Sequence, residues 1–161
     1  MNTNFRHSHL LALLHGYEKQ SLPFDLFYRK YTRAHRSLGS HDRRYIAEIA
    51  YFLLRWKGFY QHFVTNEADW NEILTLQTNC QPKDFIHDSS LPLNVRVSFP
   101  KDYFNWIEKQ LGTETAKAFC LVSNTSAPTT IRVNTLKTNR EALYKEIREL
   151  TPCRLGKETK T

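Results

Sequence analysis

Residues 38–60 have the sequence LGSHDRRYIAEIAYFLLRWKGFY, which carries the strongest helix pattern in the chain. Apolar side chains recur in it at steps of three and four residues, as on one face of an α-helix. Ser40 is a suitable N-cap residue, and Asp42 places a carboxylate in the first turn, where the helix dipole favours negative charge. The stretch therefore predicts an amphipathic helix whose apolar face the rest of the chain has to cover. The residues of that face are Ile46, Ile49, Ala50, Leu53, Trp56 and Tyr60.

Similar patterns predict helices on both sides of this segment. Most of them are bounded by a residue that starts or stops a helix, such as Pro23 near the start of the second and Gly112 after the fifth. Besides the central one, the expected helices span about 5–17, a segment that follows Ser21, 67–77, 101–111 and 113–123. The predicted inward side chains of the last two are Tyr103, Trp106, Ile107 and Leu111, and Ala116, Phe119, Cys120 and Val122.

The pattern changes after Pro128. In residues 129–136, the side chains alternate in character and many are β-branched, a pattern that predicts a strand. Thr138 and Glu141 have the spacing of a capping box, so a helix is expected over about 139–150. One strand and one helix bury too little surface to form a domain, so this α/β part is expected to be incomplete.

A proline-containing stretch, residues 78–100, is the best candidate for a connection between two parts of the chain. We therefore expect a helical domain at residues 1–95. Residues 96–161 would hold a helical connector and the incomplete α/β domain, with its strand and helix. The predicted fold class is mainly α, a helical bundle followed by the start of a small α/β domain.

Basic residues are concentrated in the first part of the chain. Residues 1–64 hold 10 Lys and Arg against 4 Asp and Glu, whereas residues 65–161 hold 13 against 12. This asymmetry favours a polyanion such as RNA as the partner of the N-terminal half. A membrane is not expected, because no apolar run approaches the ~20 residues of a span. No predicted helix joins a basic face to a wholly exposed apolar one.

The cysteines and the N-terminus argue against a metal-binding, a disulfide-stabilised or a secreted protein. Cys80, Cys120 and Cys153 are widely spaced, with no Cys-x-x-Cys and no neighbouring pair of histidines, so neither a metal site nor a disulfide framework is expected. Small buried or half-buried thiols are the simpler interpretation. The first 20 residues lack the small-residue cleavage site of a signal peptide, so the cytoplasm is the expected compartment.

Several motifs, in order along the chain, resemble those of known proteins. The first resembles a helix of NusB-type RNA-binding domains and consists of Leu38, Asp42 and Arg43, followed by an apolar run with Tyr51, Phe52, Leu53, Leu54 and Arg55. A longer series resembles the Sun/Fmu family of bacterial ribosomal RNA cytosine-5 methyltransferases. It consists of Ser98, Phe99 and Pro100; Trp106 and Ile107; Gly112, Thr115, Ala116 and Asn124; and Pro128, Ile131, Arg132, Val133, Asn134, Leu136 and Lys137.

The resemblance implies an architecture and a reaction. Family members join a NusB-like helical domain to a small α/β domain and to a Rossmann-type domain that binds S-adenosylmethionine. The five glycines of this chain form no glycine-rich loop, and Pro152 with Cys153 lacks the surroundings of the family's Pro-Cys motif. We therefore expect no catalytic residue and no cofactor site in this chain, and no activity from it alone; Cys153 is expected to be a strand residue.

The leading hypothesis is that the chain binds RNA, expected to be ribosomal, and positions it for a catalytic domain outside this sequence. The candidate RNA-binding residues are Arg29, Lys30, Arg33, Arg36, Arg43, Arg44, Arg132 and Asn134. The first six would contact phosphates. Asp25 with Arg29, and Arg44 with Glu48, have the spacing of ion pairs along a helix.

Other interpretations remain open at this point. Arg132 and Asn134 could instead pack and form hydrogen bonds within the α/β part. The chain could be a NusB-like protein-interaction or adaptor module, docking through exposed aromatic side chains around Tyr51 and Phe52 or Trp70. A third hypothesis is an enzyme that uses His35 or His41 with Asp42 as acid–base groups.

Overall fold

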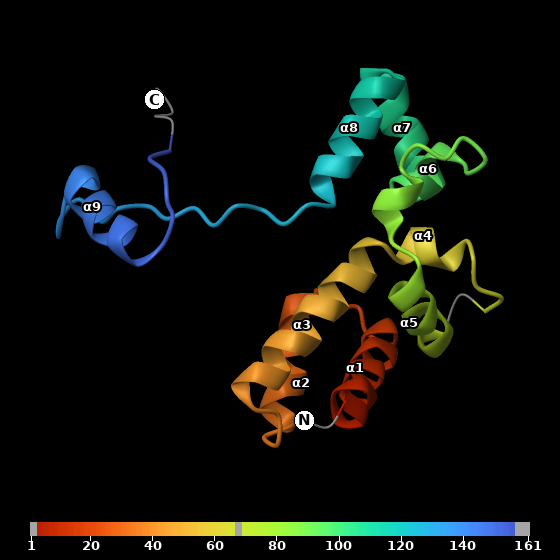
Figure 1. The fold of residues 1–161 in the computed structure, drawn as a ribbon, viewed down its shortest axis with the longest axis horizontal. Coiled ribbons are helices and arrows are strands. Elements are labelled where there is room, and N and C mark those ends of the chain that lie inside the picture. Colours follow the sequence, from red (N-terminus) through yellow and green to blue (C-terminus); the bar gives the residue numbers. More distant parts are fainter. Residues whose placement is uncertain (1–2, 67–68, 157–161) are drawn as a thin grey trace. The chain divides into compact units, whose positions relative to one another are not determined.

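The computed structural model describes residues 3–66 and 69–156, and this part of the chain is mainly helical, as predicted (Figure 1). It forms two compact units, Met1–Thr125 and Ser126–Thr161. The expected domain boundary near residue 95 stays a prediction. The helices of the first unit are α1 (Thr3–Glu18), α2 (Phe24–Ala34), α3 (Ser40–Arg55), α4 (Lys57–Gln61), α5 (Trp70–Asn79), the 3-10 helix η1 (Pro82–Phe85), α6 (Leu93–Arg96), α7 (Lys101–Leu111) and α8 (Thr113–Ser123).

The central helix α3 ends before its predicted last residue, and it includes Ser40, which was predicted to precede it as the N-cap. Gly39, and not Ser40, is its N-cap residue, and the Asp42 carboxylate accepts a hydrogen bond from the Gly39 N–H at 3.3 Å. The helix was expected to continue to Tyr60, but it ends at Arg55 and α4 starts after a bend at Trp56 (φ −100°, ψ 15°).

The bend at Trp56 is accompanied by a contact between α4 and a residue far away in the sequence. The Phe59 N–H donates a hydrogen bond to the Ser98 hydroxyl at 3.2 Å. A Cβ on Gly58 would lie 3.4 Å from the same oxygen, so the backbone of α4 packs directly against Ser98. The turn at Trp56 thus directs α4 toward the segment before α7.

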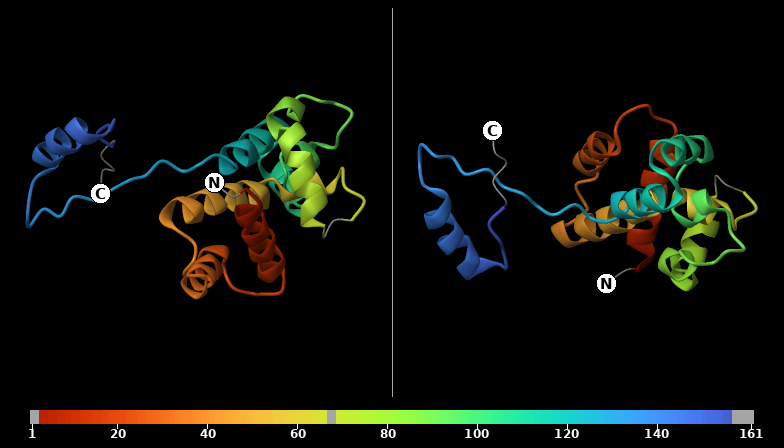
Figure 2. Two further views of the ribbon diagram at one scale, coloured as in Figure 1. Left: turned by 60° about the horizontal axis from the view of Figure 1, so that its bottom comes forward. Right: turned by 90° about the horizontal axis from the view of Figure 1, so that it is seen from above.

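The apolar stripe of α3 lies at the centre of the larger core, as expected. Its buried members Ile46, Ala50 and Leu53 pack among side chains of α1, α4 and α5. In both views of Figure 2, α1 lies against α3. Full burial of a leucine or isoleucine side chain stabilises the folded chain by about 1.5–3 kcal/mol. The partners of the stripe include Leu10, Leu13, Leu14, Phe59, Tyr60, Trp70 and Ile73.

A smaller core joins α7 to α8, and here the predicted inward faces were partly wrong. Phe104 and Ile107 of α7 are buried with Ala116 and Cys120 of α8, and with Val97. Because α8 offers small side chains at the contact, the ring of Phe104 fits between the two helices. The predicted core residues Tyr103, Trp106, Leu111, Phe119 and Val122 are exposed to 50%, 59%, 49%, 47% and 69%.

The structure also changes the predicted start of α5. Its N-cap is Asp69, whose carboxylate accepts hydrogen bonds from the N–H groups of Asn71 and Glu72 at 2.9 and 3.3 Å. The helix predicted over about 67–77 thus begins at Trp70, and its predicted first residue, Glu67, falls outside the described residues. The stretch between α5 and α7, expected to be a connection, includes η1 and α6.

The second unit contains α9 (Arg140–Leu150), which agrees with the helix predicted over about 139–150. Its N-cap is Asn139 and not the predicted Thr138. The Asn139 side-chain oxygen accepts a hydrogen bond from the Ala142 N–H at 2.8 Å. The strand predicted at 129–136 is absent, because the described residues provide no second strand with which it could pair. Cys153 likewise lies outside any strand. No described residue of 126–156 is buried.

Gly112 forms the turn between α7 and α8 and has a backbone conformation that can be tested by substitution. It has φ +76° and ψ +160°, a region that essentially only glycine adopts, and a Cβ there would meet nothing within 4 Å. We predict that Gly112→Ala lowers the free energy of unfolding by about 1–3 kcal/mol through backbone strain alone, measured by urea unfolding. The control is Gly156→Ala, where a Cβ also meets nothing within 4 Å and φ is not positive. An equal effect of both variants would contradict the strain argument.

Candidate nucleic-acid interface

Six of the eight predicted RNA-binding residues lie on α2, on α3 and on the loop between them. Side chains three and four residues apart share one side of a helix, so Arg29, Lys30 and Arg33 lie on one side of α2. All six residues are exposed. We call them the basic group: Arg29, Lys30, Arg33, Arg36, Arg43 and Arg44.

Contacts on the other side of α2 orient this group. Phe24 is buried and meets the ring of Tyr51 on α3 edge to face, with 4.8 Å between ring centroids. The Tyr28 hydroxyl donates a hydrogen bond to the Arg43 carbonyl oxygen at 2.7 Å. Thr32, also buried, donates its hydroxyl to the Tyr28 carbonyl at 3.0 Å. The contacts of Phe24 and Tyr28 hold α2 beside α3, whereas the hydrogen bond of Thr32 lies within α2. The basic side chains of α2 remain exposed to solvent.

Most charges of the basic group lack an acidic partner. Arg44 bonds to Glu48 at 2.9 Å, as predicted, but the side chains are 82% and 62% exposed, so this pair is weak. The other five form no ion pair with any described residue, and the predicted pair of Asp25 with Arg29 is not among the ion pairs. Five guanidinium or ammonium groups are therefore available to an anionic ligand.

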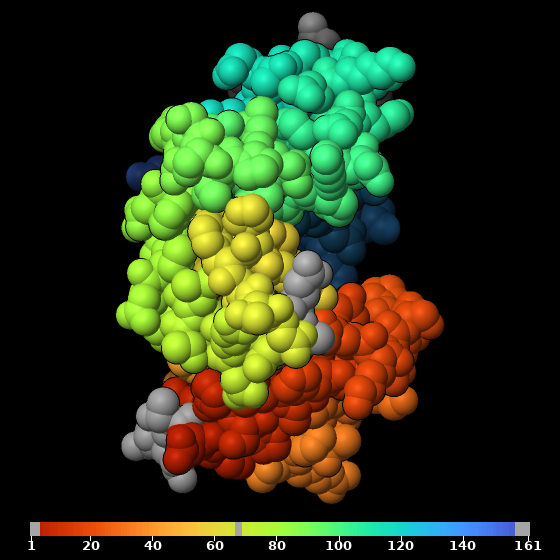
Figure 3. All heavy atoms as spheres, turned by 90° about the vertical axis from the view of Figure 1, so that its right-hand side faces the viewer, coloured from red at the N-terminus to blue at the C-terminus, as the bar shows by residue number. Residues whose placement is uncertain are grey.

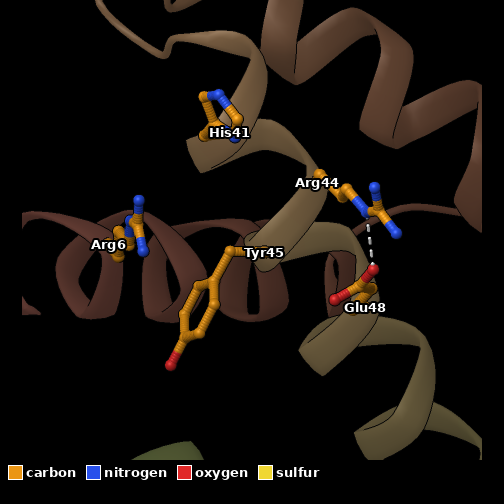
Figure 4. A pocket seen from close by; sticks show the side chains of 5 residues that line it. All are labelled: Arg6, His41, Arg44, Tyr45 and Glu48. Carbon is orange, nitrogen blue, oxygen red and sulfur yellow. Dashed lines mark hydrogen bonds and ion pairs between the residues drawn. The ribbon is translucent and has the colours of Figure 1, made fainter.

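A shallow pocket of about 440 Å³ adjoins the start of α3 (Figure 4). Figure 4 shows Arg6 of α1 beside the ring of Tyr45, and the Arg6 guanidinium lies 5.0 Å from the centroid of that ring. The lining residues are Arg6, His41, Arg44, Tyr45 and Glu48. Of these, Arg6 and Tyr45 were missed by sequence reasoning, and His41 was considered only as an acid–base group.

Asp42 lies in the first turn of α3, as predicted, and it also forms a contact that the sequence did not indicate. Its carboxylate accepts the Arg6 Nε–H at 2.7 Å, and this hydrogen bond is the main reason that the pKa of Asp42 lies below its ordinary value. Arg6 and Asp42 are 36 residues apart, so no local pattern predicts the pair. The carboxylate therefore links α1 to the first turn of α3, besides its place at the helix start.

The two histidines His9 and His35 form a cluster with Tyr31 where α1 meets α2. His9 Nδ1 lies 2.8 Å from the Tyr31 hydroxyl oxygen, and the two imidazole centroids are 5.2 Å apart. His35 Nδ1 is 2.8 Å from the Tyr31 carbonyl oxygen, so its ring is engaged with the backbone and not with Asp42. Burial, followed by the neighbouring His35, lowers the pKa of His9, and Asp42 opposes the shift.

Arg132 and Asn134 belong to the second unit and are exposed. The Asn134 side-chain oxygen accepts the Leu136 N–H at 3.1 Å, and its carbonyl accepts the N–H groups of Lys137 and Thr138 at 3.0 and 3.2 Å. Asn134 thus organises the turn that precedes α9, which resembles the alternative, structural role considered for it. The structure assigns no hydrogen bond or ion pair to the side chain of Arg132.

The docking patch considered for a protein partner needs a correction. Only the hypothesis of a protein-interaction module needs Trp70 to be exposed, and Trp70 is fully buried in the larger core with Phe59, Tyr60 and Ile73. Phe52 is half-buried, and Tyr51 is 36% exposed. The large apolar area of an indole ring explains why Trp70 is recruited to the core.

Comparison with known proteins gives one match. The model of a family described as "Methyltr_RsmF/B-like, ferredoxin-like domain" matches residues 99–151. This segment, which contains α7, α8 and α9, is thus related to a domain of methyltransferases, in agreement with the Sun/Fmu resemblance at this level. A ferredoxin-like domain contains strands, but the structure has none in this segment. No curated protein and no solved structure matches the chain.

S-adenosylmethionine is the cofactor that the resemblance implies for the complete family member. A Rossmann-type site for it needs a strand, a glycine-rich loop and a helix. Residues 3–66 and 69–156 contain no strand, and the five glycines occur singly. The residues present in this part of the chain therefore do not fit this cofactor.

The thiols and the helices give no sign of another kind of site in the described part of the chain. All three cysteines are free, and burial raises the pKa of Cys80 and of Cys120, which disfavours the reactive thiolate. In the described part of the chain, no three His, Cys, Asp or Glu side chains are grouped so that they could hold a metal ion. None of the helices described there is both long and apolar enough to cross a membrane.

The His9 cluster predicts a pH dependence of stability. Because the folded chain lowers the pKa of His9 below 6.5, the unfolded chain binds the proton more readily. Stability is therefore fully present above that value and is lost as the pH falls through the window below it. We predict that the urea midpoint decreases between about pH 8 and about pH 5.5, and that His9→Gln flattens this dependence.

His7→Gln is the matched control for this experiment, since His7 is exposed on the same helix. It should leave the pH dependence of the wild-type chain in place. Asp42 does not contribute in this window, because its pKa is lowered from 3.8 and it stays ionised there. A pH profile that is the same for His9→Gln and the wild type would contradict the assignment to His9.

Proposed function

We propose that this chain is the RNA-binding region of an S-adenosylmethionine-dependent ribosomal RNA cytosine-5 methyltransferase. It binds RNA through the basic group and positions it for a catalytic domain outside this sequence. Two observations support the proposal: the methyltransferase-family match at residues 99–151, and the exposed cations of α2, α3 and their loop. The cytoplasm is the compartment that goes with this function.

The observation that carries RNA binding is the set of five exposed cations that form no ion pair with any residue the structure describes. Like charges near each other reduce the stability of a fold unless a ligand neutralises them. When such side chains meet phosphates, they release the counterions condensed on the nucleic acid, which favours binding and makes it salt-dependent. The contacts provide affinity and orientation and carry little sequence information.

The helices α1 to α5 would serve as the NusB-like part of this protein. Their shared core holds α2 and α3 in a fixed relation through Tyr28 and Phe24, so the basic side chains are presented from a rigid support. The role of this part is then binding and positioning. S-adenosylmethionine and the reacting cysteine would come from the catalytic domain.

A charge-reversal variant tests this function. We predict that Arg29→Glu, Arg33→Glu and Arg36→Glu together weaken binding to a labelled ribosomal RNA fragment at least about tenfold at low salt, because three phosphate contacts are lost. The slope of log affinity against log salt concentration should become shallower by about 2. Fluorescence anisotropy over a series of salt concentrations measures both quantities.

The control variant carries the same change in net charge elsewhere on the chain. It replaces Lys83, Lys109 and Lys145 by Glu, all of which are exposed and outside the basic group. It should bind RNA nearly as tightly as the wild type. If the first variant keeps wild-type affinity at low salt, the proposed RNA contact is wrong, and an adaptor that binds protein becomes the better interpretation.

A further inference from the structure

A second pocket, of about 520 Å³, lies between α4 and the start of α7 and is separate from the basic group. The helices α4, α6 and α7 adjoin one another in the first unit, and their surfaces meet in Figure 3. Every ionisable side chain that lines the pocket is basic: Lys57, His62 and Lys101. No carboxylate lines it, so the charge of the pocket is complementary to an anion.

Two of these basic side chains are available to a ligand. Lys57 forms an ion pair with Glu18 at 2.7 Å, and its ammonium group lies 5.4 Å from the centroid of the Trp70 ring. Its charge is therefore already engaged within the protein. His62 and Lys101 are exposed and form no ion pair with any described residue. An anion in the pocket would therefore be bound by Lys101 and His62.

The wall between the two helices is held in one conformation. Ser98 has φ +53°, which is rare for a residue with a side chain and costs free energy. The hydrogen bond from the Phe59 N–H to its hydroxyl stabilises this conformation, and the Asn124 side chain donates to the preceding carbonyl, that of Val97, at 2.6 Å. These contacts fix the position of the next residue, Phe99, which lines the pocket.

Three aromatic rings continue from the pocket along α7. The rings of Phe99 and Tyr103 are nearly parallel, with centroids 6.0 Å apart and 12° between planes. Those of Tyr103 and Trp106 are also 6.0 Å apart, with 6° between planes. Tyr103 and Trp106 are 50% and 59% exposed, although Phe104 and Ile107 on the same helix are buried. We call Phe99, Tyr103 and Trp106 the aromatic ladder.

We propose that the pocket and the aromatic ladder together bind an unpaired segment of RNA, a second site beyond the basic group. Lys101 and His62 contact phosphate, and bases stack on the exposed rings of Tyr103 and Trp106. Bases stack on aromatic side chains only when they are free of a duplex, so single-stranded RNA is the ligand. A protein partner is less favoured, because the ladder adjoins a pocket whose charged lining is entirely basic. This inference rests on the proposed function, but it involves different residues.

The test compares single-stranded and duplex RNA with the full chain. The probes are a labelled single strand of about 12 nucleotides and the duplex of the same sequence. Trp106→Ala should weaken binding of the single strand about tenfold and leave duplex binding unchanged, because the lost interaction is base stacking. Trp106→Phe should retain most of the affinity. Lys101→Glu should weaken single-strand binding about threefold to tenfold.

Two controls separate these effects from general ones. Phe119→Ala removes an exposed aromatic ring from α8, outside the ladder, and Lys83→Glu reverses an exposed charge far from α7 in the sequence. Both should bind the single strand like the wild type. Circular dichroism and urea unfolding of Trp106→Ala should match the wild type, since Trp106 is outside the buried core.

The outcomes also distinguish this inference from the proposed function. If the wild type binds neither probe, the proposed function fails and this site fails with it. If charge reversal in the basic group weakens binding of both probes, but Trp106→Ala and Lys101→Glu behave like their controls, RNA binding stands and the second site is overturned. The ladder would then be assigned to a protein contact. Selective loss of single-strand binding supports the site.

Discussion

Burial of one stripe on α3 is the constraint on which the first unit depends. Ile46, Ala50 and Leu53 are almost inaccessible to solvent, and they are covered by α1 on one side and by α4 and α5 on another. Because the apolar surface of α3 is used for this packing, its polar side and the adjoining α2 remain at the surface. The same fold that hides the stripe thus presents basic side chains in a fixed arrangement.

The distribution of acidic partners distinguishes structural from available charges. Arg6 pairs with Asp42, and Lys57 with Glu18, and each pair joins elements that are far apart in the sequence. Their side chains are partly shielded, with exposed fractions of 19% and 18%, and of 32% and 26%. Within residues 3–66 and 69–156, the basic group forms one ion pair, the exposed pair of Arg44 with Glu48. Charges that stabilise the fold are therefore paired and sheltered, and those left over are the ones an anionic partner can use.

Local pattern predicted most helices, because a stripe of apolar residues and a cap residue are properties of a short segment. It failed where a residue far away in the sequence determines where a helix ends or which of its faces is buried. The bend at Trp56 accompanies the approach of Gly58 and Phe59 to Ser98, and the inward face of α7 depends on the small side chains that α8 offers to Phe104. For the candidate interface, the sequence indicated the basic group from charge alone. It could not indicate Arg6, since its partner Asp42 is 36 residues away. Nor could it indicate the parallel rings of the aromatic ladder, two of which, Tyr103 and Trp106, were predicted to lie in the core.

Mapping of RNA cross-links on the full chain tests the central claim, RNA binding by the first unit, most directly. Ribosomal RNA would be cross-linked to the protein by ultraviolet light at low and at high salt, and the modified peptides identified by mass spectrometry. The proposed function predicts cross-links in the peptides of α2, the following loop and the start of α3, and their loss at high salt. Cross-links that are absent from these peptides, or that are unaffected by salt, would contradict it.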